Sequence, residues 1–180
     1  MSNLHEILAY NKEFVRNKDY QKYPSNKLPS KKMAIFTCMD TRLVKLLPAA
    51  LGINNGDVKM IKSAGAQITG PFDGAVRSLL IGITELEVEE ILVIGHTNCG
   101  AGAISAPKIL NKLIKLGISK DVIDSLDMDM DTWLSGFDSV KESVLKTVNA
   151  LKSHPLMPID INITGLIIDS QTGELNLVSY

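Results

Sequence analysis

The stretch KMAIFTCMDTRL, residues 32–43, runs from a short apolar segment directly into a cysteine, an aspartate and an arginine at alternate positions. A short apolar run bounded by polar residues is typical of a β-strand that is buried on both faces, so a strand is predicted at 32–38. Strands buried on both faces belong to parallel sheets covered by helices. Cys38, Asp40 and Arg42 then stand at or just beyond the carboxyl end of such a strand.

The chain on either side alternates between strand-like and helix-like segments. Further strands are predicted at 57–65 and 89–96. A broken helical turn is predicted at 42–52, and helical segments at 70–86, 100–117, 119–126 and 136–154. This alternation predicts an α/β fold with a mainly parallel central sheet flanked by helices. At the end of the chain, Thr172-Gly173 lies between two alternating runs in residues 161–180, which predicts a C-terminal antiparallel hairpin strand.

The N-terminal segment differs from this body. Apolar residues recur at helical spacing over residues 3–17, and residues 22–32 follow as a lysine- and proline-containing connector. We expect a single domain over residues 1–180, in which residues 1–30 form an N-terminal helical arm and connector. The arm is expected to pack on the body or on a second subunit.

Composition excludes several classes of function. The 180 residues are 45% hydrophobic, enough for one core, and 19 basic against 20 acidic residues give no basic excess for nucleic acid. The apolar runs are too short to span a bilayer, and the N-terminus lacks the plan of a secretory signal. Because no run is long enough to span a bilayer, no membrane partner is expected. Two cysteines are too few for a disulfide framework, which favours a reducing, cytoplasmic location.

Both cysteines fall where parallel sheets collect ligands, at the carboxyl ends of predicted strands. Cys38 ends the first strand and Cys99 follows the third, three residues after His96. If a helix begins there, His96 and Cys99 share one face, and Cys38 and Asp40 share a face of extended chain. Two cysteines, a histidine and either water or a carboxylate make a tetrahedral zinc site of the catalytic type.

Other interpretations of these residues compete with the metal site. Each cysteine or histidine alone also fits ordinary packing, and Cys38 with Cys99 could form a redox pair. A cysteine-phosphatase loop is rejected because only three residues separate Cys38 from Arg42. GHTNCGAG lacks the spacing of a nucleotide-binding loop. Residues 127–138 match a calcium loop only in part, and a solvated acidic loop is favoured there.

The paired motifs CMDTR (38–42) and HTNCG (96–100), with KSAGA and DGAVRSLL between them, resemble those of β-class carbonic anhydrases, particularly the compact, short-chain members. The resemblance extends over about residues 30–180 and includes the N-terminal arm. One departure is Ser63, where many relatives carry asparagine, which bears on local hydrogen bonding and pocket polarity. The resemblance also implies a homodimer or higher homo-oligomer, in which the arm of each subunit packs around a second subunit.

By the same resemblance, Cys38, His96 and Cys99 are the zinc ligands. Asp40 and Arg42 are the catalytic dyad, and Asp40 is a possible fourth ligand in a closed, inactive state. The implied activity is that of a carbonate dehydratase, a lyase that hydrates carbon dioxide reversibly to bicarbonate and a proton through zinc-bound hydroxide. Two alternatives remain: a carbonyl sulfide or carbon disulfide hydrolase on the same fold, and a non-catalytic zinc protein that senses bicarbonate. Asp40 and Arg42 could also be a mere surface ion pair.

Overall fold

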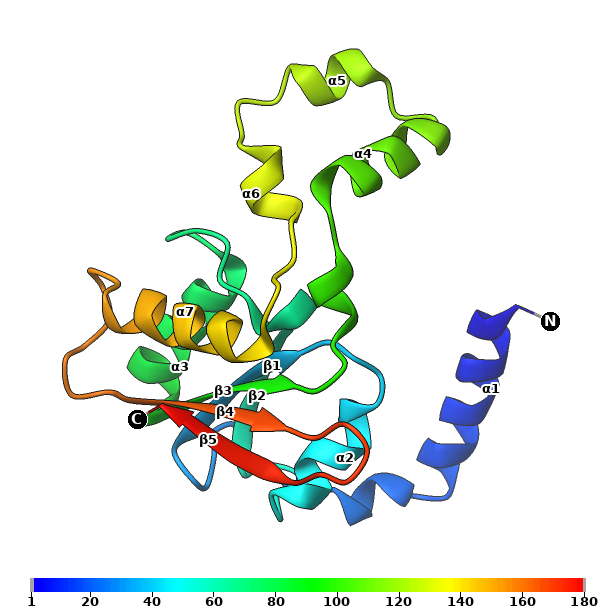
Figure 1. The fold of residues 1–180 in the computed structure, drawn as a ribbon. Helices are drawn as coiled ribbons and strands as arrows, with labels where there is room; N and C mark the ends of the chain where they lie inside the picture. Colours follow the sequence, from blue (N-terminus) through cyan, green and yellow to red (C-terminus); the bar gives the residue numbers. More distant parts are fainter. Residues whose placement is uncertain (1, 180) are drawn as a thin grey trace.

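A computed structural model describes residues 2–179, so residues 1 and 180 of the predicted domain lie outside the described part. Five strands form one sheet in the order β2-β1-β3-β4-β5 (Figure 1). Their bounds are β1 Met33–Cys38, β2 Val58–Ser63, β3 Glu90–His96, β4 Asn162–Ile168 and β5 Leu175–Ser179. β1 pairs in parallel with β2 and β3, and β3 with β4, whereas β5 pairs antiparallel with β4. The predicted α/β class and the C-terminal antiparallel strand are confirmed.

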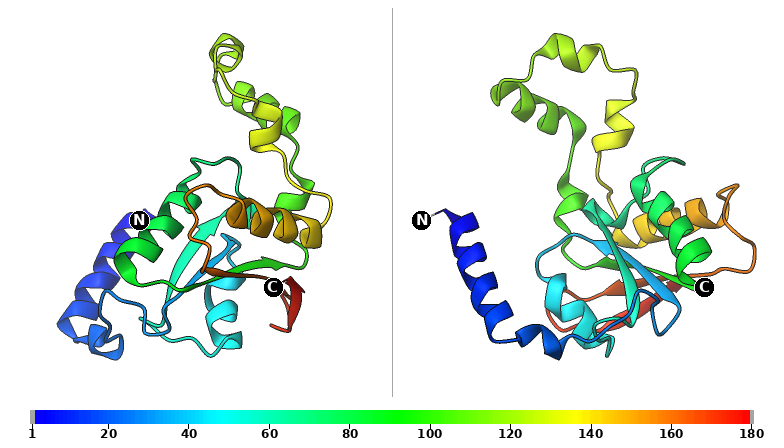
Figure 2. Two further views of the ribbon diagram at one scale, coloured as in Figure 1. Left: turned by 90° about the vertical axis from the view of Figure 1, so that its left-hand side faces the viewer. Right: turned by 180° about the vertical axis from the view of Figure 1, so that it is seen from behind.

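Helices cover both faces of the sheet (Figures 1 and 2). The helices are α1 Asn3–Arg16, α2 Leu43–Ala50, α3 Gly74–Leu86, α4 Ala106–Lys115, α5 Lys120–Asp124, α6 Met130–Leu134 and α7 Val140–Lys152, with 3-10 turns η1 Asp19–Lys22, η2 Ala64–Ala66 and η3 Gly100–Ala103. Apolar residues of α3 and α7 pack on one face of the strands, and those of α2 on the other. β1 contributes side chains to both faces of the sheet. Phe36 packs with the residues of α3 and α7, and Ile35 packs with those of α2.

Three segments differ from the sequence-based prediction. The predicted broken turn at 42–52 contains an eight-residue helix, α2, with Pro48 inside it, so the proline does not break it. The predicted helix at 100–117 is interrupted: η3 ends at Ala103, and α4 starts only at Ala106. The predicted acidic loop contains the short helix α6, whose N-terminus is capped by the Asp129 side chain. A capping carboxylate favours a helix start where composition alone suggested a loop.

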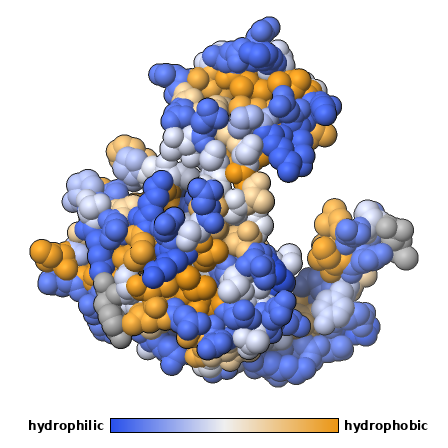
Figure 3. Space-filling model, in the orientation of Figure 1, coloured by the Kyte–Doolittle hydropathy of each residue, from blue (hydrophilic) through white to orange (hydrophobic). Residues whose placement is uncertain are grey.

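Two parts stand away from the sheet. α1 has no buried residue and extends from the body as a separate helix (Figures 1 and 2). Residues 104–137 project as a helical lobe containing α4, α5 and α6, on which apolar side chains gather at the surface (Figure 3). The predicted helical arm is confirmed as an element. No helix within residues 2–179 combines the length and apolarity needed to cross a bilayer.

Candidate metal centre

The ends of β1 and β3 bring the first two candidate ligands together. β1 and β3 are parallel neighbours, with Thr37 opposite Ile94, so their carboxyl ends lie at one edge of the sheet. Cys38 is the last residue of β1 and His96 the last residue of β3. Both side chains are buried, which fixes their directions. Parallel pairing therefore accounts for this half of the cluster.

Cys99 reaches the same point through a tight turn. Asn98 adopts a left-handed backbone with φ of 53°, a conformation that asparagine tolerates better than most residues. The chain then enters η3, for which Cys99 is the N-terminal flanking residue. The predicted helical spacing between His96 and Cys99 is therefore wrong, although the two side chains do converge. Their convergence depends on the turn at Thr97 and Asn98.

The three side chains form a compact cluster, referred to below as the metal cluster. The ligand atoms of Cys38, His96 and Cys99 all lie within 4.8 Å of one another, and the two Sγ atoms are 3.8 Å apart. Two sulfurs each about 2.3 Å from one zinc ion at the tetrahedral angle would be separated by about 3.8 Å. The sulfur spacing therefore fits a shared zinc ion.

His96 has the tautomer that a ligand requires. Its Nδ1 lies 2.9 Å from the backbone oxygen of Thr97, which can only accept, so Nδ1 carries the proton. Nε2 then presents a lone pair, and this buried atom has no hydrogen-bond partner among the described residues. An unpartnered buried nitrogen is unfavourable. A cation between Nε2 and the two sulfurs would satisfy it, and the backbone bond at Nδ1 is the usual support of a metal-binding histidine.

The Cys99 thiol keeps its proton unless a cation replaces it. Burial raises the pKa of the Cys99 thiol to about 11. Thiolate is the form that binds metal, so metal binding at this cluster would release protons and be favoured by rising pH. Both cysteines are free in the structure.

Asp40 and Arg42 form a two-pronged pair beside the metal cluster. Arg42 Nε and Nη2 donate to the two carboxylate oxygens of Asp40 at 2.9 and 2.8 Å, and the Arg42 backbone N–H donates to Oδ1 at 2.9 Å. These bonds from Arg42 hold the pKa of Asp40 well below its usual range. Asp40 Oδ2 also lies 3.8 Å from His96 Nε2. The carboxylate is thus ionised, oriented and adjacent to the metal cluster.

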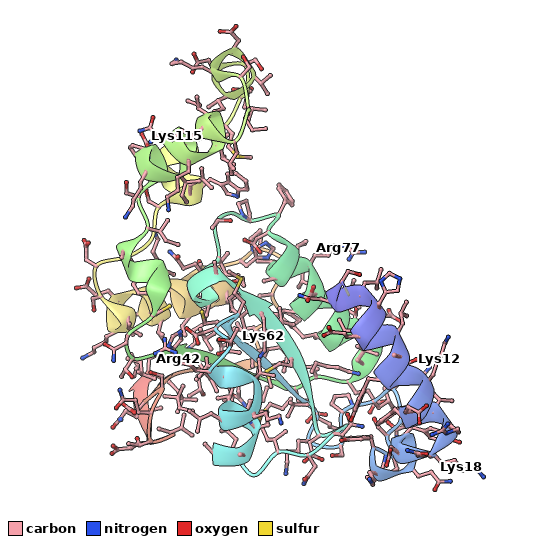
Figure 4. All side chains as sticks on the ribbon, turned by 90° about the vertical axis from the view of Figure 1, so that its right-hand side faces the viewer. Lys12, Lys18, Arg42, Lys62, Arg77 and Lys115 are labelled. Carbon is pink, nitrogen blue, oxygen red and sulfur yellow. The ribbon has the colours of Figure 1, made fainter. Side chains whose placement is uncertain are left out.

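Further contacts anchor the outer nitrogens of Arg42, which lies at the start of α2 (Figure 4). Nη2 donates to the backbone oxygen of Asn98 at 2.9 Å, and Nη1 donates to Ser170 Oγ at 3.2 Å. Sequence reasoning missed Ser170, which is 128 residues away in the chain. The signal available was its place close to the carboxyl end of a strand, because the other site residues also lie at or just beyond strand ends.

Ser63, the departure noted in the sequence, lies on the strand next to Cys38. Its backbone oxygen accepts from the Met39 N–H at 2.9 Å, and its hydroxyl donates to the Gln67 carbonyl at 3.4 Å. The side chain therefore supports the turn that follows β2.

A further buried histidine and the acidic segment 127–138 have other partners. His154 is held between the Pro71 carbonyl and the Leu156 N–H. In residues 127–138, which match a calcium loop only in part, both carboxylate oxygens of Asp129 bind Thr132. Within residues 2–179, the metal cluster is the one group of three or more histidine, cysteine or carboxylate side chains close enough to share an ion. A calcium site at 127–138 receives no support.

Comparison with known proteins gives a consistent result. A protein-family model described as "Carbonic anhydrase" matches residues 33–175. The protein YtiB of Bacillus subtilis (strain 168) is 47% identical over 181 residues, covering 99% of this chain and 97% of that protein. A "Carbon disulfide hydrolase" of Acidithiobacillus thiooxidans is 31% identical over 160 residues, covering 81% of this chain and 76% of that protein. Among solved structures, a β-carbonic anhydrase of Trichomonas vaginalis superposes with a TM-score of 0.92 at 33% identity, covering 99% of this chain and 98% of that chain.

Proposed function

Because the chain belongs to the β-carbonic anhydrase family, we propose that it is a zinc-dependent carbonic anhydrase, which hydrates carbon dioxide reversibly to bicarbonate and a proton. The observation that carries this proposal is Nε2 of His96, which has no hydrogen-bond partner among residues 2–179, lies near two sulfurs and is 3.8 Å from the Asp40 carboxylate. That arrangement supplies both a metal site and an oriented acceptor beside it.

Cys38, His96 and Cys99 would hold the zinc ion. Two thiolates and an imidazole suit zinc better than the hard cations, which prefer oxygen ligands. When bound, zinc lowers the pKa of a coordinated water from 15.7 towards about 7 and so supplies a nucleophile near neutral pH. With three protein ligands, a bound zinc ion would keep a fourth position for water or substrate.

Asp40 orients the attacking group. Since its pKa is held well below the usual range, Asp40 stays a carboxylate near neutral pH and can only accept a hydrogen bond. An acceptor fixed in place aims the proton of the nucleophile away from carbon dioxide and leaves a lone pair for attack. Such a weakly basic carboxylate does not retain the proton, which must pass on to solvent.

Arg42 fixes where Asp40 lies. The two parallel hydrogen bonds hold the carboxylate against the guanidinium, beside the metal cluster. A short movement of Asp40 away from Arg42 would bring a carboxylate oxygen into the fourth metal position. We therefore retain the closed state, with Asp40 as fourth ligand, as a property of the proposed enzyme.

A second candidate activity is hydrolysis of carbon disulfide or carbonyl sulfide. The carbon disulfide hydrolase of Acidithiobacillus thiooxidans, at 31% identity, supports it. Both activities would use the same metal cluster, and they differ in the molecule that reaches it. A zinc protein that binds bicarbonate without turnover is the third candidate.

One experiment separates the three. Stopped-flow hydration of carbon dioxide is measured on metal-quantified protein, with Cys38→Ser as the control, and sulfide release from carbon disulfide is measured on the same sample. Hydration that disappears in the control supports the proposal. Sulfide release without hydration supports the hydrolase. About one zinc per chain with neither activity supports the binding protein.

We also propose a cytoplasmic homodimer or higher homo-oligomer. The apolar residues Leu4, Ile7 and Leu8 of α1 are exposed in the single chain, which is unfavourable unless another surface covers them. One chain from a study of two tetrameric β-carbonic anhydrases of Sordaria macrospora shares the fold, with a TM-score of 0.63 at 17% identity. Two free thiols are consistent with a reducing compartment.

A further inference from the structure

Ser170 lies where the C-terminal hairpin meets the candidate active site. It lies two residues beyond the end of β4 and is buried, with 6% of its surface exposed. Its Oγ accepts a hydrogen bond from Arg42 Nη1 at 3.2 Å. A serine of the hairpin thus touches the guanidinium that holds Asp40.

The neighbouring contacts fix the direction of the Ser170 hydroxyl. Ser170 Oγ donates to the backbone oxygen of Thr97 at 3.1 Å, which uses its single proton. The Thr97 hydroxyl accepts from the Ser170 N–H at 3.0 Å and donates to Asp169 Oδ2 at 3.2 Å. Because the proton is directed to Thr97, the lone pairs of Ser170 Oγ are free for Arg42.

The same backbone oxygen of Thr97 also accepts from His96 Nδ1, at 2.9 Å. One carbonyl therefore fixes the imidazole of the metal cluster and the serine that contacts Arg42. The Asp40–Arg42 pair and the candidate metal ligand His96 are therefore linked through the backbone oxygen of Thr97.

We propose that Ser170 is a positioning residue for Asp40 and Arg42, an inference that rests on the proposed metal-dependent function. Ser170 and the Asn98 carbonyl each accept from one outer nitrogen of Arg42, so the guanidinium cannot swing away. Asp40 then stays beside the open metal position instead of occupying it. Without the Ser170 hydroxyl, Arg42 keeps only the Asn98 carbonyl as a partner besides Asp40. The closed state, in which Asp40 is the fourth metal ligand, then becomes more populated.

The test compares variants that differ only at the hydroxyl. Ser170→Ala removes it, and Ser170→Thr and Ser170→Val have similar shapes, one with the hydroxyl and one without. Ser179→Ala is the control, because Ser179 Oγ is a buried hydroxyl in the same hairpin with no hydrogen-bond partner among the described residues. Zinc content and thermal unfolding are measured for each protein.

For carbon dioxide hydration we expect kcat to fall about 10-fold in the alanine and valine variants, with KM nearly unchanged. The threonine variant should recover most of the loss, and the control should match the wild type. If the alanine variant fails to fold, the threonine and valine pair carries the comparison. Equal kcat in threonine and valine variants, or an equal loss in Ser179→Ala, would overturn the proposal.

A second measurement does not depend on turnover. Azide binds at the open position of a metal site, and its affinity is measured by absorption on cobalt-substituted protein. Because Asp40 competes for that position, azide should bind several-fold more weakly to the alanine and valine variants than to wild type. If wild type lacks hydration activity but the azide series behaves as expected, the proposed function fails and the role of Ser170 stands. Equal azide affinity across the series rejects that role.

Discussion

Nε2 of His96 lies 3.8 Å from Oδ2 of Asp40, and Nε2 has no hydrogen-bond partner among the described residues. Both atoms present lone pairs, because Nδ1 carries the imidazole proton and Arg42 keeps Asp40 ionised. A buried acceptor that faces a carboxylate oxygen is unfavourable unless a proton or a cation lies near both. Two sulfurs at the same point favour a metal cation over a single proton.

Replacing Cys38 by serine should abolish zinc binding and activity together. A hydroxyl is a poor zinc ligand, and two remaining ligands do not hold the ion. We expect the rate of carbon dioxide hydration to fall by more than about 100-fold. Loss of a residue that only supports a metal ligand lowers activity by up to about 100-fold, and loss of a ligand should lower it further. Zinc is measured by elemental analysis. His154→Gln is the matched control, since His154 is a buried histidine bound to Pro71, and it should keep its zinc. Full zinc content in Cys38→Ser would contradict the assignment.

Replacing Asp40 by asparagine should separate catalysis from metal binding. The amide keeps the shape but loses the charge that Arg42 pairs with, and its NH2 group cannot accept a hydrogen bond. We expect kcat to fall by about 10²- to 10⁴-fold, the usual contribution of a proton-handling side chain. Zinc content should stay the same.

The Arg42→Lys variant complements that experiment. Lysine keeps the charge but lacks the planar fork, so Asp40 should be less well oriented and kcat should fall about 10-fold. An unchanged kcat in both variants would show that the pair is an ordinary surface ion pair.

Much of the site follows from local sequence patterns. Cys38 and His96 end two apolar runs, and parallel pairing places the ends of such runs at one edge of a sheet. The Asp40–Arg42 pair is equally local, because the two residues are only two positions apart and the backbone N–H of Arg42 takes part. These relationships involve near neighbours or the regular geometry of strands, which is why the sequence could predict them.

Other parts depend on contacts that no short stretch contains. Cys99 reaches the cluster because Asn98 adopts a left-handed conformation, which a helical spacing rule does not anticipate. Ser170 reaches Arg42 only after the hairpin packs against the turn at Thr97. Likewise, Pro48 lies inside α2, although proline usually interrupts helices. The contact between Ser170 and Arg42 exists only in the folded chain, so no local pattern could have predicted it.

Asp169 should make stability depend on pH. The backbone N–H groups of Thr172 and Gln171 donate to its carboxylate and hold its pKa below the ordinary value. A carboxyl group with a depressed pKa stabilises the folded state above its unfolded pKa of about 3.9, and this contribution is lost as pH falls through the lower folded value. Asp169→Asn should therefore be less stable than wild type at pH 7.

The difference between the two proteins should shrink on acidification. It should begin to close below about pH 5 and decrease further as the wild-type carboxylate takes up its proton. Urea unfolding at a series of pH values measures it, and the comparison cancels pH effects common to both proteins. A difference that stays constant from neutral to acidic pH would argue against this role of Asp169.

Gly65 should tolerate no side chain. Its φ is +68°, and an added Cβ would lie 2.8 Å from Phe137 and 2.9 Å from Ala101. Gly65→Ala should cost about 1–2 kcal/mol for the left-handed backbone and about 1–3 kcal/mol for overpacking. Gly52 has a similar φ of +63°, but a Cβ added there would meet no atom within 4 Å. Gly52→Ala should therefore incur only the backbone cost. Equal losses in denaturant unfolding would show that packing around Gly65 can adjust.

The apolar face of α1 should be needed for self-association. Ile7 and Leu8 are 64% and 51% exposed in the single chain, and no residue of α1 is buried. If a second copy covers this face, Ile7→Ala combined with Leu8→Ala removes apolar contact area and should weaken the dimer by at least about 10-fold, since each fully buried side chain of this type contributes about 1.5–3 kcal/mol. Lys12→Ala, also on α1, is the control. Sedimentation equilibrium over a range of concentrations measures the change. A double variant that associates as tightly as wild type would mean that α1 packs elsewhere, on the body of its own chain.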